Sequence, residues 1–248
     1  MNDQKAGTAS TYRVPYRNQL ARFILRPTFR LIFHILARIR IVGRENVPAS
    51  GPYLIAMNHV SIYDPPFIVA FWPTCPEAAG AIEIWSKPGQ ATLARLYYGI
   101  PVRRGEYDRR LIETMLQALQ SGRPLLIAPE GGRSHTPGLQ PGFPGVAYLM
   151  DIARVPVVPV GIVGTTDDFF QCAIRGQRPL LEIKIGKPFL LPEIAGSGEA
   201  RRAARRHNVD LIMYSLAELL PPGYKGVYAN TIDESAWSDP HDRRANRE

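Results

Sequence analysis

The chain has 248 residues with 45% apolar side chains, enough to bury one sizeable core, and this composition excludes wholesale disorder. Its formal charge of +8 is uneven: residues 1–50 hold nine basic and two acidic side chains, and the rest of the chain is nearly balanced. A basic segment on a neutral body predicts attraction to an anionic surface. The two cysteines, Cys75 and Cys172, fit no metal-ligand spacing and are expected to be reduced, buried thiols.

The N-terminal segment, residues 1–45, is predicted to be a basic amphipathic helix at a membrane interface. Its large apolar residues follow helical spacing and its arginines step by four along another face: Leu20, Phe23, Ile24, Leu31 and Ile35 against Arg22, Arg26 and Arg30. Pro27 is expected to split or kink the helix. Its uncharged stretches are too short to cross a bilayer, and no secretory cleavage site follows. Two alternatives stay open, a helix packed on its own domain and a nucleic-acid-binding arm, although no nucleic-acid-binding fold signature accompanies the segment.

From residue 46 to 229, strand-like and helical patterns alternate. The predicted strands are 53–57, 79–84, 100–103, 124–128, 156–163 and 180–186, and the predicted helices are 64–72, 89–98, 107–121, 144–153 and 199–219. This alternation predicts a single α/β domain with a mostly parallel mixed sheet flanked by helices. Residues 230–248 are polar, lack an apolar period and are expected to form a mostly disordered tail.

The segment Asn58-His-Val-Ser-Ile-Tyr-Asp64 follows the first of these strands. It places an imidazole and a carboxylate five residues apart. A carboxylate that holds one ring nitrogen leaves the other free to take a proton from a hydroxyl. The spacing therefore predicts a general base, His59, oriented by Asp64. The alternative is a loop histidine beside an aspartate that caps the next helix.

Arginines and glycines follow two later strands. Arg103-Arg104-Gly105 ends a short strand, and an arginine fork suits phosphate oxygens. The alternative is a pair of arginines exposed on the surface.

Ala128-Pro-Glu-Gly-Gly-Arg-Ser134 follows a buried strand, and its glycines allow a turn whose N–H groups can bind a phosphate or an oxyanion. The alternative there is an ordinary turn with a Glu–Arg pair. Because ligands gather at the carboxyl ends of parallel strands, His59, Arg104 and Glu130 are expected to meet at one rim of the sheet.

A fourth segment, Val155-Pro-Val-Val-Pro-Val-Gly161, suits either an apolar wall or an ordinary core strand. Together and in this order, the four segments resemble the motifs of the glycerolipid acyltransferase family, which includes the 1-acylglycerol-3-phosphate acyltransferases. The resemblance covers roughly residues 40–229 and includes the ending Leu219-Leu-Pro-Pro-Gly-Tyr-Lys-Gly-Val-Tyr228. The matching positions are Asn58, His59 and Asp64; Pro101, Val102, Arg104 and Gly105; Pro129, Glu130, Gly131, Arg133 and Ser134; and Val155 to Val160.

This resemblance implies an O-acyltransferase that moves a fatty acyl chain from acyl-CoA or acyl-carrier protein to a lysophospholipid hydroxyl. The acceptor expected first is 1-acylglycerol-3-phosphate, which gives phosphatidic acid. Glycerol 3-phosphate, another lysophospholipid and a non-phosphate alcohol stay open. No cofactor is expected beyond the acyl donor, which is a co-substrate. The enzyme is expected to lie on the cytoplasmic face of a membrane as a peripheral or monotopic protein.

The implied roles divide the site into catalytic and substrate-binding residues. His59 is the base and Asp64 orients it. The substrate-binding set is Asn58, Arg104, Glu130, Gly131 and Arg133. Asn58 is expected to shape the turn at His59, Glu130 to position the two arginines on an acceptor phosphate, and backbone N–H groups near Gly131 to steady the oxyanion.

The sequence departs from the family pattern at three places. Ala128 stands where phenylalanine is usual, and Gly132 where threonine is usual. The family often carries a lysine after the third motif, but residues 139–145 contain no basic side chain. An acceptor phosphate is therefore less firmly implied than acyl transfer itself.

Two rival functions belong to other classes. A serine hydrolase would use Ser61 or Ser134, but the elbow Gly-x-Ser-x-Gly is absent. A catalytically silent lipid-binding protein would retain the fold without turnover. The five histidines are scattered and predict no metal site. Oligomeric state and acyl-chain length leave no trace in the sequence.

Overall fold

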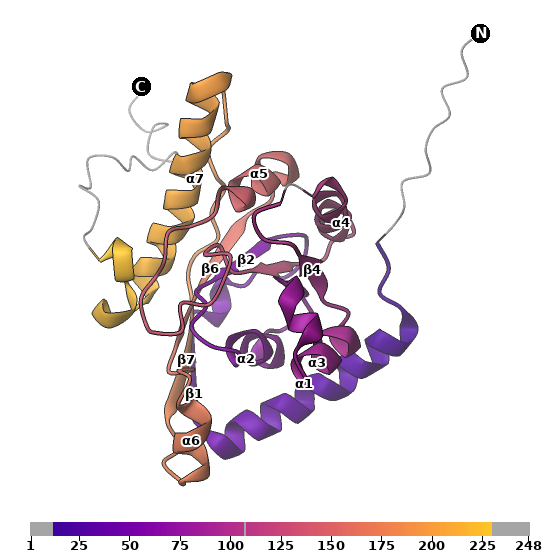
Figure 1. Ribbon diagram of the computed structural model, residues 1–248, viewed down its shortest axis with the longest axis vertical. Helices are drawn as coiled ribbons and strands as arrows, with labels where there is room; N and C mark the ends of the chain where they lie inside the picture. Colours follow the sequence, from indigo (N-terminus) through magenta and orange to yellow (C-terminus); the bar gives the residue numbers. More distant parts are fainter. Residues whose placement is uncertain (1–11, 107, 230–248) are drawn as a thin grey trace.

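The computed structural model describes residues 12–106 and 108–229 (Figure 1). Their centre is a seven-stranded sheet of order β1-β7-β6-β2-β5-β3-β4. The strands are β1 Arg38–Val42, β2 Leu54–Met57, β3 Glu77–Ala81, β4 Ile100–Val102, β5 Leu125–Ile127, β6 Val157–Val163 and β7 Leu180–Ile185. The helices are α1 Tyr16–Leu36, α2 Asp64–Phe71, α3 Gln90–Tyr97, α4 Arg109–Gln120, α5 Pro144–Ala153, α6 Phe169–Ile174 and α7 Gly198–Leu219. Short 3₁₀ turns are η1 Arg44–Asn46, η2 Ile82–Ser86, η3 Pro222–Tyr224 and η4 Gly226–Tyr228.

The sheet is mostly parallel, and the antiparallel pairing of β6 with β7 makes it mixed. Helices cover both faces because successive residues of a strand point to opposite sides. In β2, Leu54 and Ala56 join the core beneath α4, α5 and α7, whereas Ile55 and Met57 join the core beneath α1, α2 and α6. The predicted fold class, one α/β domain with a mostly parallel mixed sheet, is confirmed.

The predicted elements differ from the structure in a few places. β1 lies inside the segment that was expected to be helical, because its alternating Arg and Ile residues follow a strand period that the wider helical pattern obscured. β3 begins at Glu77 rather than at residue 79, since a buried glutamate interrupts the apolar run. The short helix α6 was not predicted. Helix α1 passes through Pro27 without a break, so the proline does not split it. The predicted tail, 230–248, lies outside the described residues.

Helix α1 packs on the domain through its arginines rather than through its apolar face. Arg22 is 3% exposed and makes two hydrogen bonds to the carboxylate of Glu77, which is 0% exposed. Arg123 and the hydroxyl of Tyr12 donate to the same carboxylate, and burial raises the pKa of Tyr12, which keeps it a donor. Arg22 also donates to the carbonyl of Tyr97. The buried charge is therefore fully paired.

The next two turns of α1 hold the end of α2. A helix leaves its last carbonyls without partners, and the side chain of Arg26 donates to the carbonyls of Val69 and Trp72. Arg30 donates to the carbonyl of Ala70 through two nitrogens, at 2.7 and 3.1 Å. The expectation that these arginines face an anionic surface is wrong for this part of the segment, because they donate hydrogen bonds to Glu77 and to the carbonyls at the end of α2.

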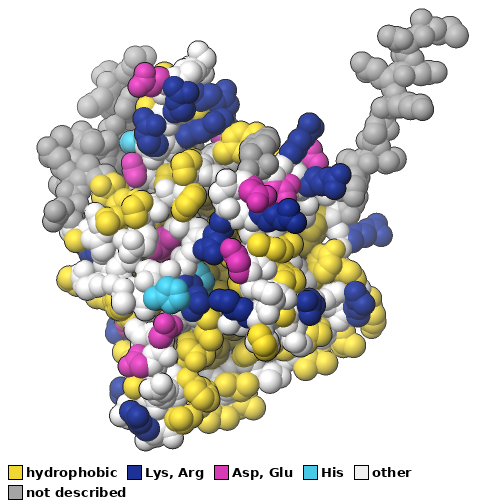
Figure 2. Space-filling view, in the orientation of Figure 1, with side chains coloured by type: hydrophobic (Ala, Val, Ile, Leu, Met, Phe, Trp, Pro, Cys, Tyr) yellow, Lys and Arg dark blue, Asp and Glu magenta, His cyan; other side chains and the backbone are white. Residues whose placement is uncertain are grey.

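The opposite face of α1 is apolar and open to solvent. Phe23 is 77% exposed, and Leu31 and Ile35 are each 62% exposed. Figure 2 shows apolar side chains along the lower edge of the molecule, where Figure 1 places α1. No helix in the described part of the chain is both long and apolar enough to cross a membrane.

The substitution Arg22→Ala tests the buried contact between α1 and the domain. It leaves the Glu77 carboxylate in the core with fewer partners, so we expect the free energy of unfolding to fall by about 3–5 kcal/mol. Urea denaturation measures the change. Arg17→Ala, an exposed arginine on the same helix, is the control and should change stability by less than about 0.5 kcal/mol. Equal effects of the two substitutions would contradict the role given to Arg22.

Candidate active site

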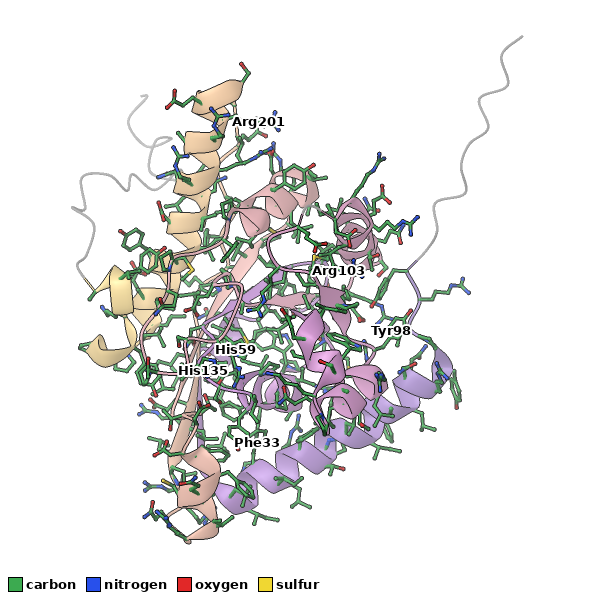
Figure 3. All side chains as sticks on the ribbon, viewed as in Figure 1. Phe33, His59, Tyr98, Arg103, His135 and Arg201 are labelled. Atoms are coloured by element: carbon green, nitrogen blue, oxygen red, sulfur yellow. The ribbon has the colours of Figure 1, made fainter. Side chains whose placement is uncertain are left out.

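The site is centred on His59, two residues beyond β2, and Asp64, the first residue of α2 (Figure 3). The distance from His59 Nδ1 to Asp64 Oδ2 is 2.8 Å. Asp64 is completely buried, and the His59 side chain is 14% exposed. A carboxylate accepts, so Nδ1 carries the proton in this geometry and Nε2 presents a lone pair. The arrangement suits proton abstraction from a bound hydroxyl.

The Asp64 carboxylate also folds the turn that connects it to His59. Oδ2 accepts hydrogen bonds from the backbone N–H of Val60 at 2.7 Å and of Ser61 at 2.8 Å. The hydroxyl of Thr165, just beyond β6, donates to Oδ1. Pro65 and Pro66 follow at the start of α2, where missing N–H groups cost nothing. A negative charge at this end of α2 is also favoured by the helix dipole.

Thr165 is a positioning residue that no sequence pattern indicates. Its side chain is buried, and its loop is held by the C-terminal segment, since the backbone N–H of Gly164 donates to the hydroxyl of Tyr224 at 3.1 Å. A hydroxyl residue after an apolar strand is too common to be a signal. Only the parallel pairing of β2 with β6 brings it to Asp64.

Asn58 holds the end of β2 against β6. Its side-chain oxygen accepts from the backbone N–H of Ile162 at 2.7 Å, and its amide donates to the carbonyl of the same residue at 2.9 Å. The residue is 2% exposed. It therefore extends the pairing of β2 with β6 by one residue, directly before His59. Its expected role in shaping the turn at His59 stays a prediction.

Glu130 holds the backbone of His59 rather than the arginines. One carboxylate oxygen accepts from the N–H of His59 at 2.9 Å and the other from the N–H of Gln140 at 2.8 Å. Burial raises the pKa of Glu130, and these two N–H groups oppose the shift. The N–H of Ser134 donates to the carbonyl of His59 at 2.9 Å. The third motif thus binds both the N–H and the carbonyl of His59. Sequence spacing does not reveal these two contacts.

Gly131 forms the turn after Glu130, and no residue with a side chain fits at this position. Its φ is +68°, and an added Cβ would lie 2.8 Å from the ring of Phe143. Its N–H donates to the carbonyl of Ala128, so it is not available for an oxyanion. The N–H groups of Gly132 and Arg133 have no hydrogen-bond partner in the described part of the chain. They replace Gly131 as the candidate oxyanion donors.

Of the two consecutive arginines after β4, Arg104 is the one at the site. Its guanidinium donates to the carbonyl of Gly131 at 3.3 Å and to Glu83 at 3.2 Å. The absence of a side chain at Gly132 makes room for it, because a Cβ there would lie 2.7 Å from Arg104 Nη1. Arg103 instead lies 4.0 Å from Glu106. Arg133 is partly buried and directly precedes Ser134, whose N–H donates to the carbonyl of His59.

Glu130 thus contacts the backbone of His59, and Arg104 contacts the neighbouring residue Gly131. A joint role for the three side chains in binding a substrate stays a prediction. Cys75 and Cys172 are free thiols, but both are partly exposed rather than buried. Within residues 12–106 and 108–229, no group of three His, Cys, Asp or Glu side chains is placed to hold a metal ion.

Comparison with known proteins finds one family, two relatives of the same name and one solved structure. Residues 38–163 match the family model described as Acyltransferase. A protein named "Lysophospholipid acyltransferase LPCAT4", from Homo sapiens, is 33% identical over 138 residues, and the Mus musculus protein of that name matches equally. The match covers 53% of this chain but only 25% of those relatives. The crystal structure of the 1-acyl-sn-glycerophosphate (LPA) acyltransferase PlsC from Thermotoga maritima has a TM-score of 0.59 at 21% identity and covers 82% of this chain and 80% of that one.

Proposed function

This chain belongs to the acyltransferase family, and we propose that it transfers a fatty acyl chain from an acyl thioester to the hydroxyl of a lysophospholipid. The observation that carries the proposal is the His59–Asp64 pair, whose second imidazole nitrogen has no hydrogen-bond partner among the described residues. The names of the similar proteins support a lysophospholipid acceptor. We place 1-acylglycerol-3-phosphate first among the acceptors, with phosphatidic acid as the product.

In the proposed reaction His59 Nε2 takes the proton of the acceptor hydroxyl as its oxygen attacks the thioester carbonyl. The tetrahedral intermediate carries a negative charge on the former carbonyl oxygen, which the N–H groups of Gly132 and Arg133 would stabilise. Collapse of the intermediate breaks the carbon–sulfur bond. The leaving thiolate takes the proton back from the imidazolium, which leaves an ester, a free thiol and neutral His59. No covalent enzyme intermediate is needed.

Arg104 and Arg133 are proposed to bind the acceptor phosphate. The present partner of Arg104, Glu83, is half exposed, and an exposed ion pair contributes only about 0–1 kcal/mol. A phosphate can therefore replace that contact and gain a two-pronged hydrogen bond. With no lysine in residues 139–145, these two arginines carry the phosphate contact. A non-phosphate alcohol would be the acceptor if they do not.

The rival serine hydrolase finds no support in the geometry. Ser61 is 0% exposed, and its hydroxyl accepts from the backbone N–H of Tyr63. The hydroxyl of Ser134 donates to the carbonyl of Thr136 at 2.6 Å. Neither hydroxyl contacts the ring of His59 in the described structure. A silent lipid-binding protein is disfavoured because Asp64 holds the His59 ring with Nε2 left without a partner in the described structure, which is the arrangement of a general base.

A thioester-release assay across a panel of acceptors, with and without the phosphate, tests this function. We expect release by the wild type to require an acceptor, and His59→Ala to lower kcat by at least about 10²-fold, the usual contribution of a general base. His207→Ala, an exposed histidine of α7, is the control and should leave the rate with acyl-CoA unchanged. Release without an acceptor, or a His59→Ala variant with more than a tenth of the wild-type rate, would contradict the mechanism.

The exposed apolar face of α1 is proposed to lie in a membrane surface. Each fully buried Leu, Ile or Phe side chain contributes about 1.5–3 kcal/mol, so this face alone can hold the enzyme at its lipid substrate. Since Arg22, Arg26 and Arg30 are bound within the domain, insertion of apolar side chains should dominate over attraction to lipid charge. We propose a peripheral enzyme on the cytoplasmic face, where the acyl donor arrives.

Sedimentation with vesicles tests the membrane contact. We expect Phe23→Asp/Leu31→Asp to abolish binding, because two carboxylates would have to enter the apolar layer. Arg17→Ala, which removes an exposed charge from the same helix, should bind like the wild type, and binding should depend little on the fraction of anionic lipid. Equal binding by the double variant would place the contact elsewhere. Deleting residues 1–45 is a poorer test, because it also removes β1 and the partner of Glu77.

A further inference from the structure

The guanidinium of Arg104 contacts the loop that carries the candidate oxyanion donors. Arg104 follows β4, Glu83 follows β3 and Gly131 follows β5, and these three strands run parallel and side by side. One nitrogen of the guanidinium, Nη1, donates to the carbonyl of Gly131 at 3.3 Å, and another, Nη2, donates to the carboxylate of Glu83 at 3.2 Å. One planar group therefore joins the loops at the carboxyl ends of three neighbouring strands.

The contact with Gly131 orients one peptide unit of the site. The peptide between Gly131 and Gly132 is trans, and in a planar trans peptide the carbonyl of one residue and the N–H of the next point in opposite directions. A guanidinium that holds the carbonyl of Gly131 therefore turns the N–H of Gly132 away from Arg104. That N–H has no hydrogen-bond partner among the described residues and is one of the two candidate oxyanion donors.

Little else in the described structure holds this peptide unit. Further along the loop, the N–H of Ser134 is bound to the carbonyl of His59. The hydrogen bond from Arg104 is the one that the unit of Gly131 and Gly132 makes within the described part of the chain. Because the unit has a glycine on each side, its rotation meets little steric resistance. Without Arg104 the peptide can turn over, and the N–H then leaves the orientation seen here.

The guanidinium has room at this place because residue 132 is a glycine. An added Cβ at Gly132 would lie 2.7 Å from Nη1 of Arg104 and 4.0 Å from its Cζ, and it would meet no other described residue within 4 Å apart from its chain neighbours. Threonine, usual at this position in the family, has a Cβ, so the contact depends on this departure from the family pattern. The backbone of Gly132 lies outside the left-handed region, so alanine can adopt it.

We propose that Arg104 is a positioning residue for the oxyanion site, which holds the N–H of Gly132 in the orientation that receives the oxygen of the tetrahedral intermediate. This inference rests on the proposed acyl transfer and adds to the phosphate contact proposed for the same side chain. A charged donor on the carbonyl also polarises the peptide and strengthens its N–H as a donor. Because the oxyanion exists only after attack, loss of the contact should appear in kcat.

The two roles of Arg104 use different parts of its guanidinium. The edge formed by Nη2 and Nε suits two phosphate oxygens, and Nη2 is the nitrogen that now contacts Glu83. Nη1 stays on the carbonyl of Gly131 when a phosphate replaces Glu83. The phosphate and the oxyanion loop therefore bind the same group without competing for it.

Steady-state kinetics with saturating donor and acceptor test the positioning role. Gly132→Ala keeps the charge of Arg104 but displaces Nη1 from the carbonyl, and we expect kcat to fall at least about tenfold, since loss of a whole oxyanion donor costs about 10²–10³-fold. Arg104→Ala should lower kcat by a similar factor and also raise KM for the acceptor. The double variant should retain the kcat of Arg104→Ala, because the new Cβ then displaces nothing.

A measurement on the substrate-free enzyme separates the peptide contact from the phosphate contact. The carbon-13 resonance of the Gly131 carbonyl reports the hydrogen bond that this oxygen accepts. We expect it to shift in Arg104→Ala, although the two residues are far apart in sequence, and to stay at its wild-type position in Arg103→Ala. Arg103 is the adjacent exposed arginine, which lies 4.0 Å from Glu106, so its removal is the charge-matched control and should also preserve the wild-type kcat.

Three outcomes would overturn this inference. The first is a Gly132→Ala variant with the kcat of the wild type. The second is a double variant whose loss equals the product of the two single losses, which would make the two residues independent. The third is a Gly131 resonance that Arg104→Ala leaves unmoved. If the wild type itself transfers no acyl chain, the proposed function fails instead, so the two failures are distinguishable.

Discussion

The buried carboxylate of Asp64 is the contact on which the candidate site depends. It accepts from the imidazole of His59, from two N–H groups of the turn between them and from Thr165, so the ends of β2 and β6 and the start of α2 converge on one side chain. A buried charge is tolerated only when it is paired in this way. Because the Asp64 carboxylate already accepts four hydrogen bonds, proton abstraction is expected at Nε2 of His59, which has no partner among the described residues.

Helix α2 links this site to α1. Its first residue is Asp64, and its last carbonyls are bound by Arg26 and Arg30. The arginines of α1 face the domain because α2 and Glu77 offer acceptors there, and this reverses the usual orientation of an amphipathic surface helix. The apolar face of α1 is left outward as a consequence. The same contacts that attach α1 to the domain thus create the surface proposed to meet the lipid.

Much of the fold and the core of the site could be predicted from the sequence, because local spacing determines them. The five-residue separation of His59 and Asp64, and the alternation of strands and helices, are of this kind. The orientation of α1 could not be predicted: helical spacing defines two faces but not which one finds acceptors. The bond from Glu130 to the backbone of His59 and the role of Thr165 depend on pairing between distant strands, which no local pattern encodes.

The protonation of the His59 ring is the most direct test of the central claim. Nitrogen-15 NMR of histidine-labelled protein, at a pH where the enzyme turns over, distinguishes the two neutral tautomers. A proton on Nδ1 and a bare Nε2, lost in Asp64→Asn, is the result that the geometry requires of a base steered by Asp64. A proton on Nε2 in the neutral ring would show that the nitrogen facing the substrate cannot accept one, and would contradict the account.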